Sequence, residues 1–209
     1  MKNDHRCVIV GGAPITDYQA VRGYLRADDF VICCDCGLRH REGLGIQPSL
    51  IVGDFDSADD PRLPVETIIL PREKDDTDTF FAAKEGVRRG FDSFLLLGVI
   101  GGRLDHSLCN LSILYYLDSL DKKALAVDDF SEIEVISGQP ACVEDRYPYF
   151  SLLNLSGTAE GVTIRGAKYP LENASITCDY QYGVSNEALP GQTAQISVKH
   201  GRLLLIKDR

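Results

Sequence analysis

The sequence predicts an α/β domain, with a mostly parallel sheet covered by helices, followed by a smaller antiparallel β-sandwich. Over residues 1–128, short apolar runs alternate with amphipathic stretches, and continuous apolar runs are typical of parallel strands buried on both faces. Polar or glycine-rich clusters follow these runs, where ligands bind in such sheets. After Asp128 and Asp129, short strand-like runs alternate with Gly, Pro and Asn turns, which is typical of a sandwich. We therefore expect two domains, 1–128 and 129–209.

Hydrophobic periodicity gives the expected elements in order. The first domain has apolar runs that predict strands at 6–10, 30–34, 49–52, 66–70, 93–97 and 124–127. Helices are expected from Thr16 or Asp17 to residue 26, over 75–89 and over 104–120. In the second of these, Phe80, Ala83 and Val87 fall on one face, with acidic residues in the first turn and arginines in the last, as the helix dipole favours. The second domain is expected to have strands at 132–136, 149–155, 161–165, 174–178, 193–198 and 203–206.

Composition excludes several classes of protein. A hydrophobic fraction of 44% and a charged fraction of 25% are ordinary for a soluble globular chain, and no apolar run approaches the roughly 18 residues of a membrane span. The N-terminus has no signal-peptide pattern, so we expect a cytoplasmic protein. The formal net charge of -9 argues against a nucleic-acid surface, but it is compatible with a phosphate ligand if metal ions mediate.

Seven cysteines are an odd number, and without a secretory signal they are expected to be reduced thiols. Cys33, Cys34 and Cys36 lack a second Cys or His pair at zinc spacing, which favours core or near-site thiols over a metal centre.

The central motif follows the third expected strand. Ile51 and Val52 end the strand, Gly53 allows a turn, and Asp54 and Asp56 follow two residues apart. In an extended backbone both carboxylates point to the same side, where a hard divalent cation such as Mg2+ would relieve their repulsion. The alternative is a capped turn after a strand, since Asp, Gly and Ser are common turn residues.

Residues 74–78, Lys-Asp-Asp-Thr-Asp, add carboxylates at the start of an expected helix. Asp75 and Asp78 would share a face if the helix begins there. The alternative is N-capping, in which Asp or Thr side chains accept from the first backbone amides. Three aspartates in four residues exceed what a cap requires, which favours metal binding by at least one of them.

Residues 98–106, Gly-Val-Ile-Gly-Gly-Arg-Leu-Asp-His, join a strand to a helix. Such a turn offers backbone N–H groups and a positive helix end to a phosphate, and Arg103 adds a bidentate donor. The turn has neither the Walker A ending nor the Gly-x-Gly-x-x-Gly spacing. Asp105 and His106 have the alternative roles of a cap and a surface residue. Asn110, one helical turn beyond His106, is a candidate to order it by a hydrogen bond.

Taken together, Gly-Asp-Phe-Asp-Ser, Lys-Asp-Asp-Thr-Asp and Gly-Gly-Arg-Leu-Asp-His, in this order and separation, resemble the thiamine pyrophosphokinase family. The late stretch Gly-Val-Ser-Asn-Glu and the closing Gly-Arg-Leu-Leu-Leu also look like that family's C-terminal sequence, so the resemblance covers nearly the whole chain. It implies an α/β domain that binds MgATP, a sandwich that binds thiamine, and a homodimer with thiamine between subunits. The reaction implied is transfer of the diphosphoryl group of ATP to the hydroxyl of thiamine, giving thiamine diphosphate and AMP.

The resemblance also implies roles for individual residues. It assigns the metal to Asp54, Asp56 and Asp78, with Arg103 and Asp105 completing the catalytic set. Thiamine would be held by Ser185 and Asn186, which we expect in a turn of the sandwich. The nucleotide site would be lined by Asp35, Lys74, Asp75, Gly102, Arg103 and His106.

Two features of the sequence bear on these assignments: a cysteine where the family more usually has glycine, and the absence of tryptophan. Asp35-Cys36-Gly37 replaces the more usual Asp-Gly-Gly, and cysteine cannot adopt positive φ as cheaply as glycine. The chain has no Trp, so aromatic packing against thiamine would come from Tyr or Phe. Tyr180 and Tyr182 are candidates, with cross-strand packing as their alternative role.

Two other functions remain open at this point. A phosphatase could use Asp54 as nucleophile and Asp56 as acid, although it needs a longer apolar strand before Asp54 and a downstream Lys and acidic pair. A nucleotide-sensing module would need no turnover. Three convergent carboxylates together with Arg103 favour the enzyme, because binding alone does not demand them.

Overall fold

The computed structural model describes residues 5–55, 63–73 and 75–209, so the predicted site residues Asp56 and Lys74 lie outside the described residues. The chain divides into two compact units, Met1–Asp129 and Phe130–Arg209. No helix in the described parts of the chain has both the length and the apolar character needed to cross a membrane.

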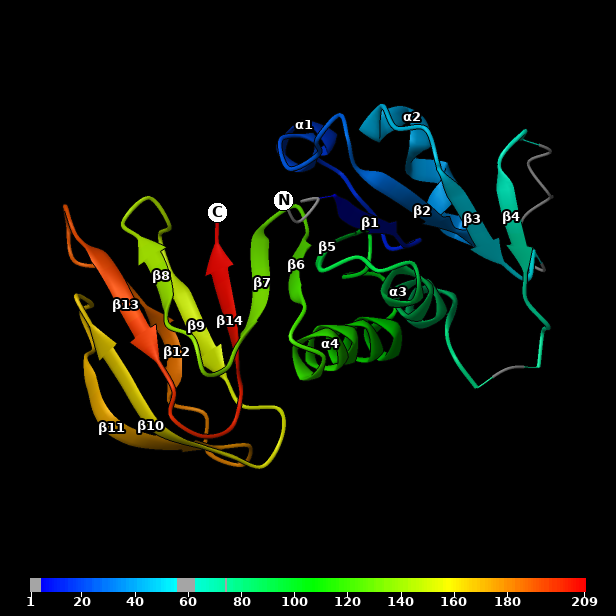
Figure 1. The fold of residues 1–209 in the computed structure, drawn as a ribbon. Coiled ribbons are helices and arrows are strands. Elements are labelled where there is room, and N and C mark those ends of the chain that lie inside the picture. The colour runs from blue at the N-terminus through cyan, green and yellow to red at the C-terminus, as the bar shows by residue number, and fades with distance from the viewer. Residues whose placement is uncertain (1–4, 56–62, 74) are drawn as a thin grey trace. The chain divides into compact units, whose positions relative to one another are not determined.

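The described strands of the first unit form a parallel sheet in the order β6-β5-β1-β2-β3-β4 (Figure 1), as the continuous apolar runs predict. Val8 and Val10 of β1 pack with Val21 and Leu44 in one core cluster. The strand bounds are β1 Arg6–Val10, β2 Phe30–Cys34, β3 Leu50–Gly53, β4 Glu66–Ile69, β5 Ser93–Leu97 and β6 Lys123–Val127.

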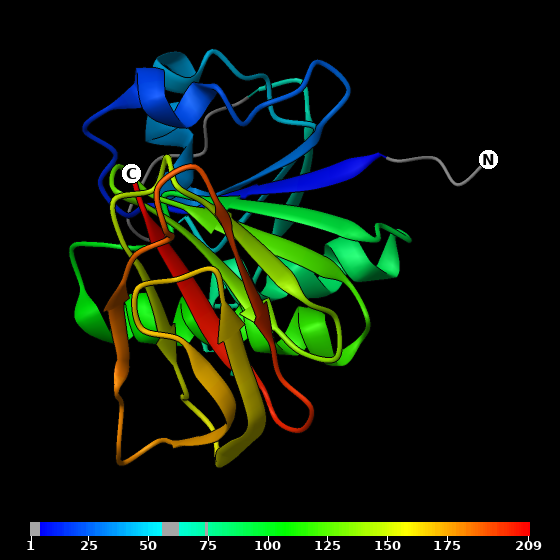
Figure 2. The ribbon, with the colours of Figure 1, turned by 90° about the vertical axis from the view of Figure 1, so that its left-hand side faces the viewer.

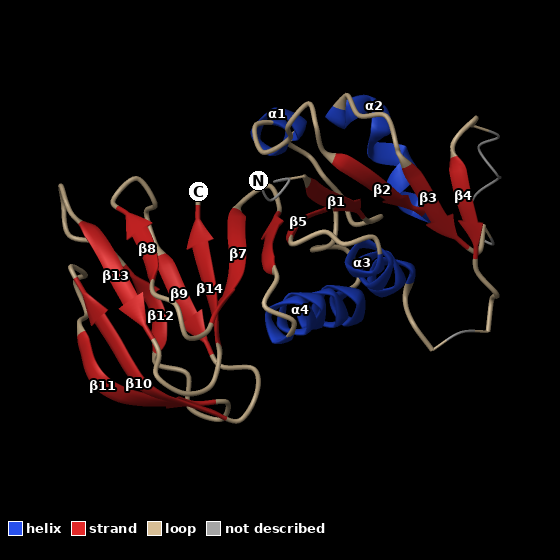
Figure 3. Cartoon of the chain, in the orientation of Figure 1, coloured by secondary structure: helices blue, strands red, loops and turns tan. Residues whose placement is uncertain are grey.

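Helices cover both faces of this sheet. Figure 3 shows α1 and α2 on one face and α3 and α4 on the other. A short 3-10 helix, η1, follows β2 directly. The bounds are α1 Tyr18–Arg22, η1 Asp35–His40, α2 Arg41–Leu44, α3 Asp78–Arg88 and α4 Leu104–Ser119.

Two helix predictions were wrong in detail. The helix expected to reach residue 26 ends at Arg22, because the next amides, those of Tyr24 and Leu25, donate to carbonyls only three residues back. In α3, only Ala83 of the predicted face is buried, and the buried face is made of Thr79, Ala82, Ala83 and Gly86. The helix lies close to the sheet, since a Cβ on Gly86 would be 2.6 Å from the ring of Phe94, so small residues face the strands.

The second unit is the predicted antiparallel sandwich. One sheet has the order β12-β9-β14-β7, with β14 (red in Figures 1 and 2) between β9 and β7, and the other has the order β11-β10-β13-β8. The bounds are β7 Ser131–Ile136, β8 Ala141–Glu144, β9 Phe150–Leu153, β10 Thr158–Arg165, β11 Leu171–Thr177, β12 Gly183–Asn186, β13 Thr193–Ser197 and β14 Leu203–Asp208.

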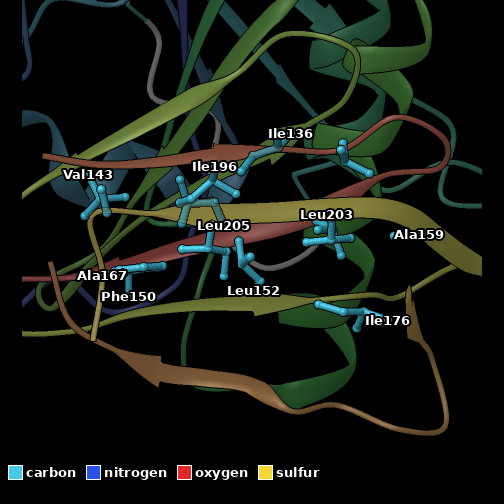
Figure 4. Packing of buried hydrophobic residues seen from close by; sticks show 14 of the residues in the cluster. Ile136, Val143, Phe150, Leu152, Ala159, Ala167, Ile176, Ile196, Leu203 and Leu205 are labelled. Carbon is cyan, nitrogen blue, oxygen red and sulfur yellow. The ribbon is translucent and has the colours of Figure 1, made fainter. Parts of the chain in front are cut away.

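The two sheets of this unit share a core made of alternate residues along each strand (Figure 4). Phe150, Leu152 and Leu205 come from one sheet, and Val143 and Ile196 come from the other. This period of two is what sheet-on-sheet packing requires. Strands β8 and β12 were not predicted, and β12 occupies the place where a turn was expected around residues 185 and 186.

Candidate functional site

The first unit has a cavity at the carboxyl ends of its strands, where the strand order reverses. Strand β1 has β2 as its neighbour along one edge and β5 as its neighbour along the other edge. Parallel sheets bind ligands at such a point. The cavity has a volume of about 670 Å³ and is lined by Gly12, Ala13, Pro14, Cys34, Asp35, Cys36, Arg39, Asp54, Arg72, Asp76, Thr77, Asp78, Thr79, Gly98, Val99, Gly101, Gly102, Arg103, His106 and Asn110.

Three carboxylates converge in this cavity. Asp35 follows β2, Asp54 follows β3 and Asp78 opens α3. One carboxylate oxygen from each lies within 4.8 Å of the others, with Asp35 buried and the other two half-buried. Carboxylates held this close repel one another unless protons or a cation intervene. Oxygen ligands of this kind suit a hard divalent cation, so the residues present fit a metal site.

Gly53 makes this convergence possible. A Cβ on Gly53 would lie 2.7 Å from the Cβ of Asp35, closer than non-bonded carbons approach, and 3.2 Å from its Cα, which is also tight. The end of β3 therefore comes this close to the start of η1 because Gly53 has no side chain. The negative charge is also felt by Cys34, whose thiol pKa is raised first by burial and then by Asp78.

The cluster brings together two of the three predicted metal ligands, Asp54 and Asp78, and adds Asp35. The family resemblance assigns Asp35 to the nucleotide site instead. The sequence contains a pattern that indicates the position of Asp35 beside Asp54. Asp35 directly follows β2, and Asp54 directly follows β3, the neighbouring parallel strand. The third predicted ligand, Asp56, lies outside the described residues.

The start of α3 differs from the prediction. The helix begins at Asp78 and is capped by Thr77, whose Oγ1 accepts from the Phe80 amide over 3.2 Å. Asp75 therefore precedes the helix and cannot share a face with Asp78; it is exposed and does not line the cavity. Asp76 lines the cavity but is paired with Lys84 over 2.8 Å.

The glycine-rich turn after β5 packs against the loop after β1. The Ala13 amide donates to the Gly98 carbonyl over 2.7 Å. A Cβ on Gly98 would lie 2.6 Å from the Gly11 carbonyl, and a Cβ on Gly11 equally close to the Gly98 carbonyl. Gly101 and Gly102 have φ of 109° and 69°, a region that favours glycine. Both line the cavity; the family resemblance assigns Gly102 to the nucleotide site, and that role stays a prediction.

Arg103 and His106 line the cavity, whereas Asp105 does not. Asp105 instead holds the Arg103 guanidinium through two bonds of 3.1 and 2.5 Å. The bond from Arg103 lowers the pKa of Asp105 to about 2, so the pair stays ionised at neutral pH. Asn110 does not order His106; its Nδ2 donates to the Val99 carbonyl over 2.8 Å, and its Oδ1 accepts from Thr79 over 2.6 Å.

Sequence reasoning missed Arg39, Arg72 and Thr79 as lining residues. Arg39 lies in η1, which is bound closely to β1, since a Cβ on Gly37 would lie 2.0 Å from the Val10 carbonyl oxygen. Cys36 does not adopt positive φ, so its replacement of glycine causes no strain of that kind.

The second unit has a smaller cavity of about 310 Å³, lined by Ile164, Tyr169, Leu171, Tyr182, Gly183, Val184 and Asn186. The Asn186 side chain is buried and largely occupied. Its Oδ1 accepts from the amides of Tyr169 (3.0 Å) and Glu187 (2.9 Å), and its Nδ2 donates to the Tyr169 carbonyl over 2.8 Å. Asn186 therefore fixes Tyr169 beside the cavity and keeps one N–H for a ligand.

Ser185 is exposed and has a φ of 56°, which is costly for a residue other than glycine. The pairing of β12 with β9 shifts register between Gly183 and Asn186, so Ser185 lies in a β-bulge. Bulges of this kind re-aim side chains beside functional sites. Tyr180 and Tyr182 pack against each other with ring centroids 5.2 Å apart, and Tyr182 also lines the cavity.

Comparison with known proteins gives consistent matches in both units. Residues 21–126 match the family model described as thiamin pyrophosphokinase, catalytic domain, and residues 140–203 match that of thiamin pyrophosphokinase, vitamin B1 binding domain. Among curated proteins, thiamine pyrophosphokinase of Bacillus subtilis (strain 168) is 28% identical over 208 residues, covering 96% of this chain and 97% of that protein.

Solved structures agree. The crystal structure of thiamine pyrophosphokinase from Bacillus subtilis has a TM-score of 0.84 at 27% identity, covering 97% of this chain and 98% of that one. That of thiamin pyrophosphokinase from Geobacillus thermodenitrificans has a TM-score of 0.81 at 29% identity, covering 98% and 97%. The yeast thiamin pyrophosphokinase structure, at 15% identity and a TM-score of 0.80 over 100% of this chain and 87% of that one, shares the fold.

Proposed function

The chain belongs to the thiamin pyrophosphokinase family. We propose that the 670 Å³ cavity of its first unit is the site that binds ATP for the transfer to thiamine. The chain is a thiamine diphosphokinase: it transfers the diphosphoryl group of ATP to the hydroxyl of thiamine, giving thiamine diphosphate and AMP. The main support for placing ATP in this cavity is the convergence of three carboxylates, those of Asp35, Asp54 and Asp78. They lie beside a glycine-rich turn, at the point where the strand order reverses.

The ATP-dependent transfer requires a divalent metal. We propose Mg2+, held by Asp35, Asp54 and Asp78, with Asp56 as a further ligand on its sequence position alone. When bound, the ion would neutralise charge on the phosphates and on the departing AMP. The three carboxylates would supply its oxygen ligands, and the lack of a side chain on Gly53 lets Asp35 and Asp54 come close together.

The remaining groups of the cavity would position the triphosphate. Gly101 and Gly102 offer backbone N–H groups, and Arg103 a guanidinium that Asp105 has already oriented. Catalysis of this kind is positioning plus charge neutralisation, so an oriented guanidinium contributes without further ordering. His106 would line the same site. Lys74 and Asp75 are proposed near the phosphates from their place in the family motif.

Thiamine is proposed to bind in the second unit. Gly183 and Asn186 of β12 line the 310 Å³ cavity there together with Tyr169 and Tyr182, whereas Ser185, in the bulge between them, is not one of its lining residues. Neutral hydrogen-bonding groups suit an aminopyrimidine, and aromatic faces suit the cationic thiazolium. We propose the division into a nucleotide domain, 1–128, and a thiamine domain, 129–209, on this basis.

The remaining proposals come from the family resemblance. We propose that the protein acts in the cytoplasm as a homodimer with thiamine bound between the two copies. The large exposed fractions of Tyr169 (57%) and Val184 (50%) beside the smaller cavity support a covering surface there.

The direct test is product analysis with ATP, thiamine and Mg2+. Thiamine-dependent formation of AMP and thiamine diphosphate in equal amounts is expected. Release of inorganic phosphate without AMP would indicate a phosphatase, and ATP binding without products would indicate a sensing module. Either result would overturn the proposed use of the cavity.

A further inference from the structure

We propose that Arg39 is a further phosphate-binding residue of the nucleotide site, on the wall of the cavity formed by η1. The inference rests on the proposed function, because it takes the cavity to bind ATP. Arg39 lies in the same 3-10 helix as Asp35 and lines the cavity together with Arg72 and Arg103. A triphosphate drawn to the three carboxylates through a divalent cation would lie among these arginines.

The exposed Arg39 side chain is bonded within η1 and lies beside Gly12 of the loop that follows β1. Its Nε donates to the Cys36 carbonyl over 2.9 Å. A Cβ on Gly12 would lie 3.1 Å from Nη2 of Arg39 and 2.5 Å from the Cβ of Cys36. Glycine at this position therefore lets η1 and the guanidinium lie against the loop, and both Gly12 and Arg39 face the cavity.

Arg39 differs from Arg103 and Arg89 in what its guanidinium pairs with. Arg103 contacts Asp105 over 2.5 Å, and Arg89 contacts Glu66 and Glu85. Within the part of the chain that the structure describes, no carboxylate oxygen lies within 4.0 Å of a side-chain nitrogen of Arg39. With Nε tethered to a carbonyl, both Nη groups remain for bidentate bonds to phosphate oxygens.

The neighbouring residue His40 fixes the backbone beneath Arg39. Its Nε2 donates to the Ala13 carbonyl over 2.9 Å, and its Nδ1 accepts from the Tyr18 hydroxyl over 2.7 Å. Tyr18 in turn lies against Gly43, where a Cβ would be 2.5 Å from the ring. Residues 39 and 40 therefore lie on a preorganised turn, which lowers the entropy lost when the guanidinium binds.

The test compares binding of ATP and of adenosine, each in the presence of Mg2+, by titration calorimetry. The proteins are the unmodified chain, Arg39→Ala, Arg39→Lys, and Arg165→Ala as a control that removes one exposed positive charge from β10. Arg39→Ala is expected to weaken ATP binding by about tenfold to a hundredfold, the loss of a charge-assisted contact. Adenosine binding should be unchanged, Arg39→Lys should fall between, and Arg165→Ala should match the unmodified protein.

Two results would overturn the inference alone. ATP binding by Arg39→Ala at the unmodified strength would show that the guanidinium contacts no phosphate. Equal weakening of ATP and adenosine, seen also in Arg39→Lys, would show that Arg39 supports the cavity or the base instead. Absence of ATP binding by the unmodified protein would overturn the proposed function and the inference together.

Discussion

Gly53→Ala tests whether the carboxylate cluster depends on the close approach of β3 and η1. The new Cβ would lie 2.7 Å from the Asp35 Cβ, whereas ordinary contact needs 3.4 to 4 Å, so the two segments must separate by about 1 Å. The neighbouring atoms are backbone and Cβ, which cannot swing away as the end of a long side chain can. Overpacking of this kind costs about 1–3 kcal/mol of the free energy of unfolding.

The effect on catalysis should exceed the effect on stability. A displacement of about 1 Å at a catalytic group lowers turnover by roughly a hundredfold, and a wider cluster should also raise the Mg2+ concentration at half-maximal rate. The assay is AMP formation as a function of Mg2+, with the melting temperature measured on the same samples.

Gly23→Ala is the matched control, because its Cβ would meet only the Ala20 carbonyl at 3.7 Å and its φ is -58°. That variant should keep the activity and Mg2+ dependence of the unmodified protein. If Gly53→Ala also kept both, the reasoning that links Gly53 to the cluster would be refuted.

Three further predictions address other parts of the account. Arg103→Ala should lower the rate about a hundredfold, because it removes a phosphate contact worth roughly 2–3 kcal/mol. The measurement is steady-state kinetics with both substrates saturating. An unchanged kcat would show that Arg103 does not contact phosphate in the reaction. Asn186→Ala should raise the KM for thiamine and leave the KM for ATP unchanged. It should also lower the melting temperature by several degrees, since it releases Tyr169 and leaves part-buried backbone groups unpaired. An equal rise in both KM values would argue against thiamine binding in the second unit. His40 has a pKa below its ordinary 6.5, chiefly because burial disfavours its charged form, so the unfolded chain binds that proton first and stability falls as the pH drops below about 6.5. Urea unfolding at neutral and at acidic pH should show that acidification lowers the free energy of unfolding less for His40→Gln than for the exposed control His200→Gln. Equal losses of unfolding free energy in the two variants would contradict the role given to His40.

Much of the fold could be predicted because its strands are buried apolar runs. The strands at 6–10, 30–34 and 93–97 have the predicted bounds, since burial on both faces leaves a continuous hydrophobic signal. Strand β8 was missed because only Val143 of its residues is buried. Strand β12 was missed because the bulge at Ser185 removes the alternation that marks a strand.

Local motifs in the sequence point to several of the residues that line the cavity. Asp54, Asp78, Gly102, Arg103 and His106, which local motifs single out, line the cavity of the first unit, and their binding roles stay predictions. The place of Asp35 depends on the parallel pairing of β2 with β3, and that of Arg39 on how η1 packs against the loop after β1. Both are tertiary contacts between separate segments, and no spacing within one motif encodes them.

The central claim is that Asp35, Asp54 and Asp78 form one metal site. Binding of Mn2+ as a spectroscopic probe, measured by electron paramagnetic resonance in the presence of ATP, tests it most directly. Asp54→Asn should weaken Mn2+ binding by at least about tenfold, because it removes one ligand charge from a partly buried cluster. Asp121→Asn makes the same chemical change at an exposed position outside the cavity and should bind Mn2+ as the unmodified protein does. Equal Mn2+ affinity in Asp54→Asn and Asp121→Asn would contradict the claim.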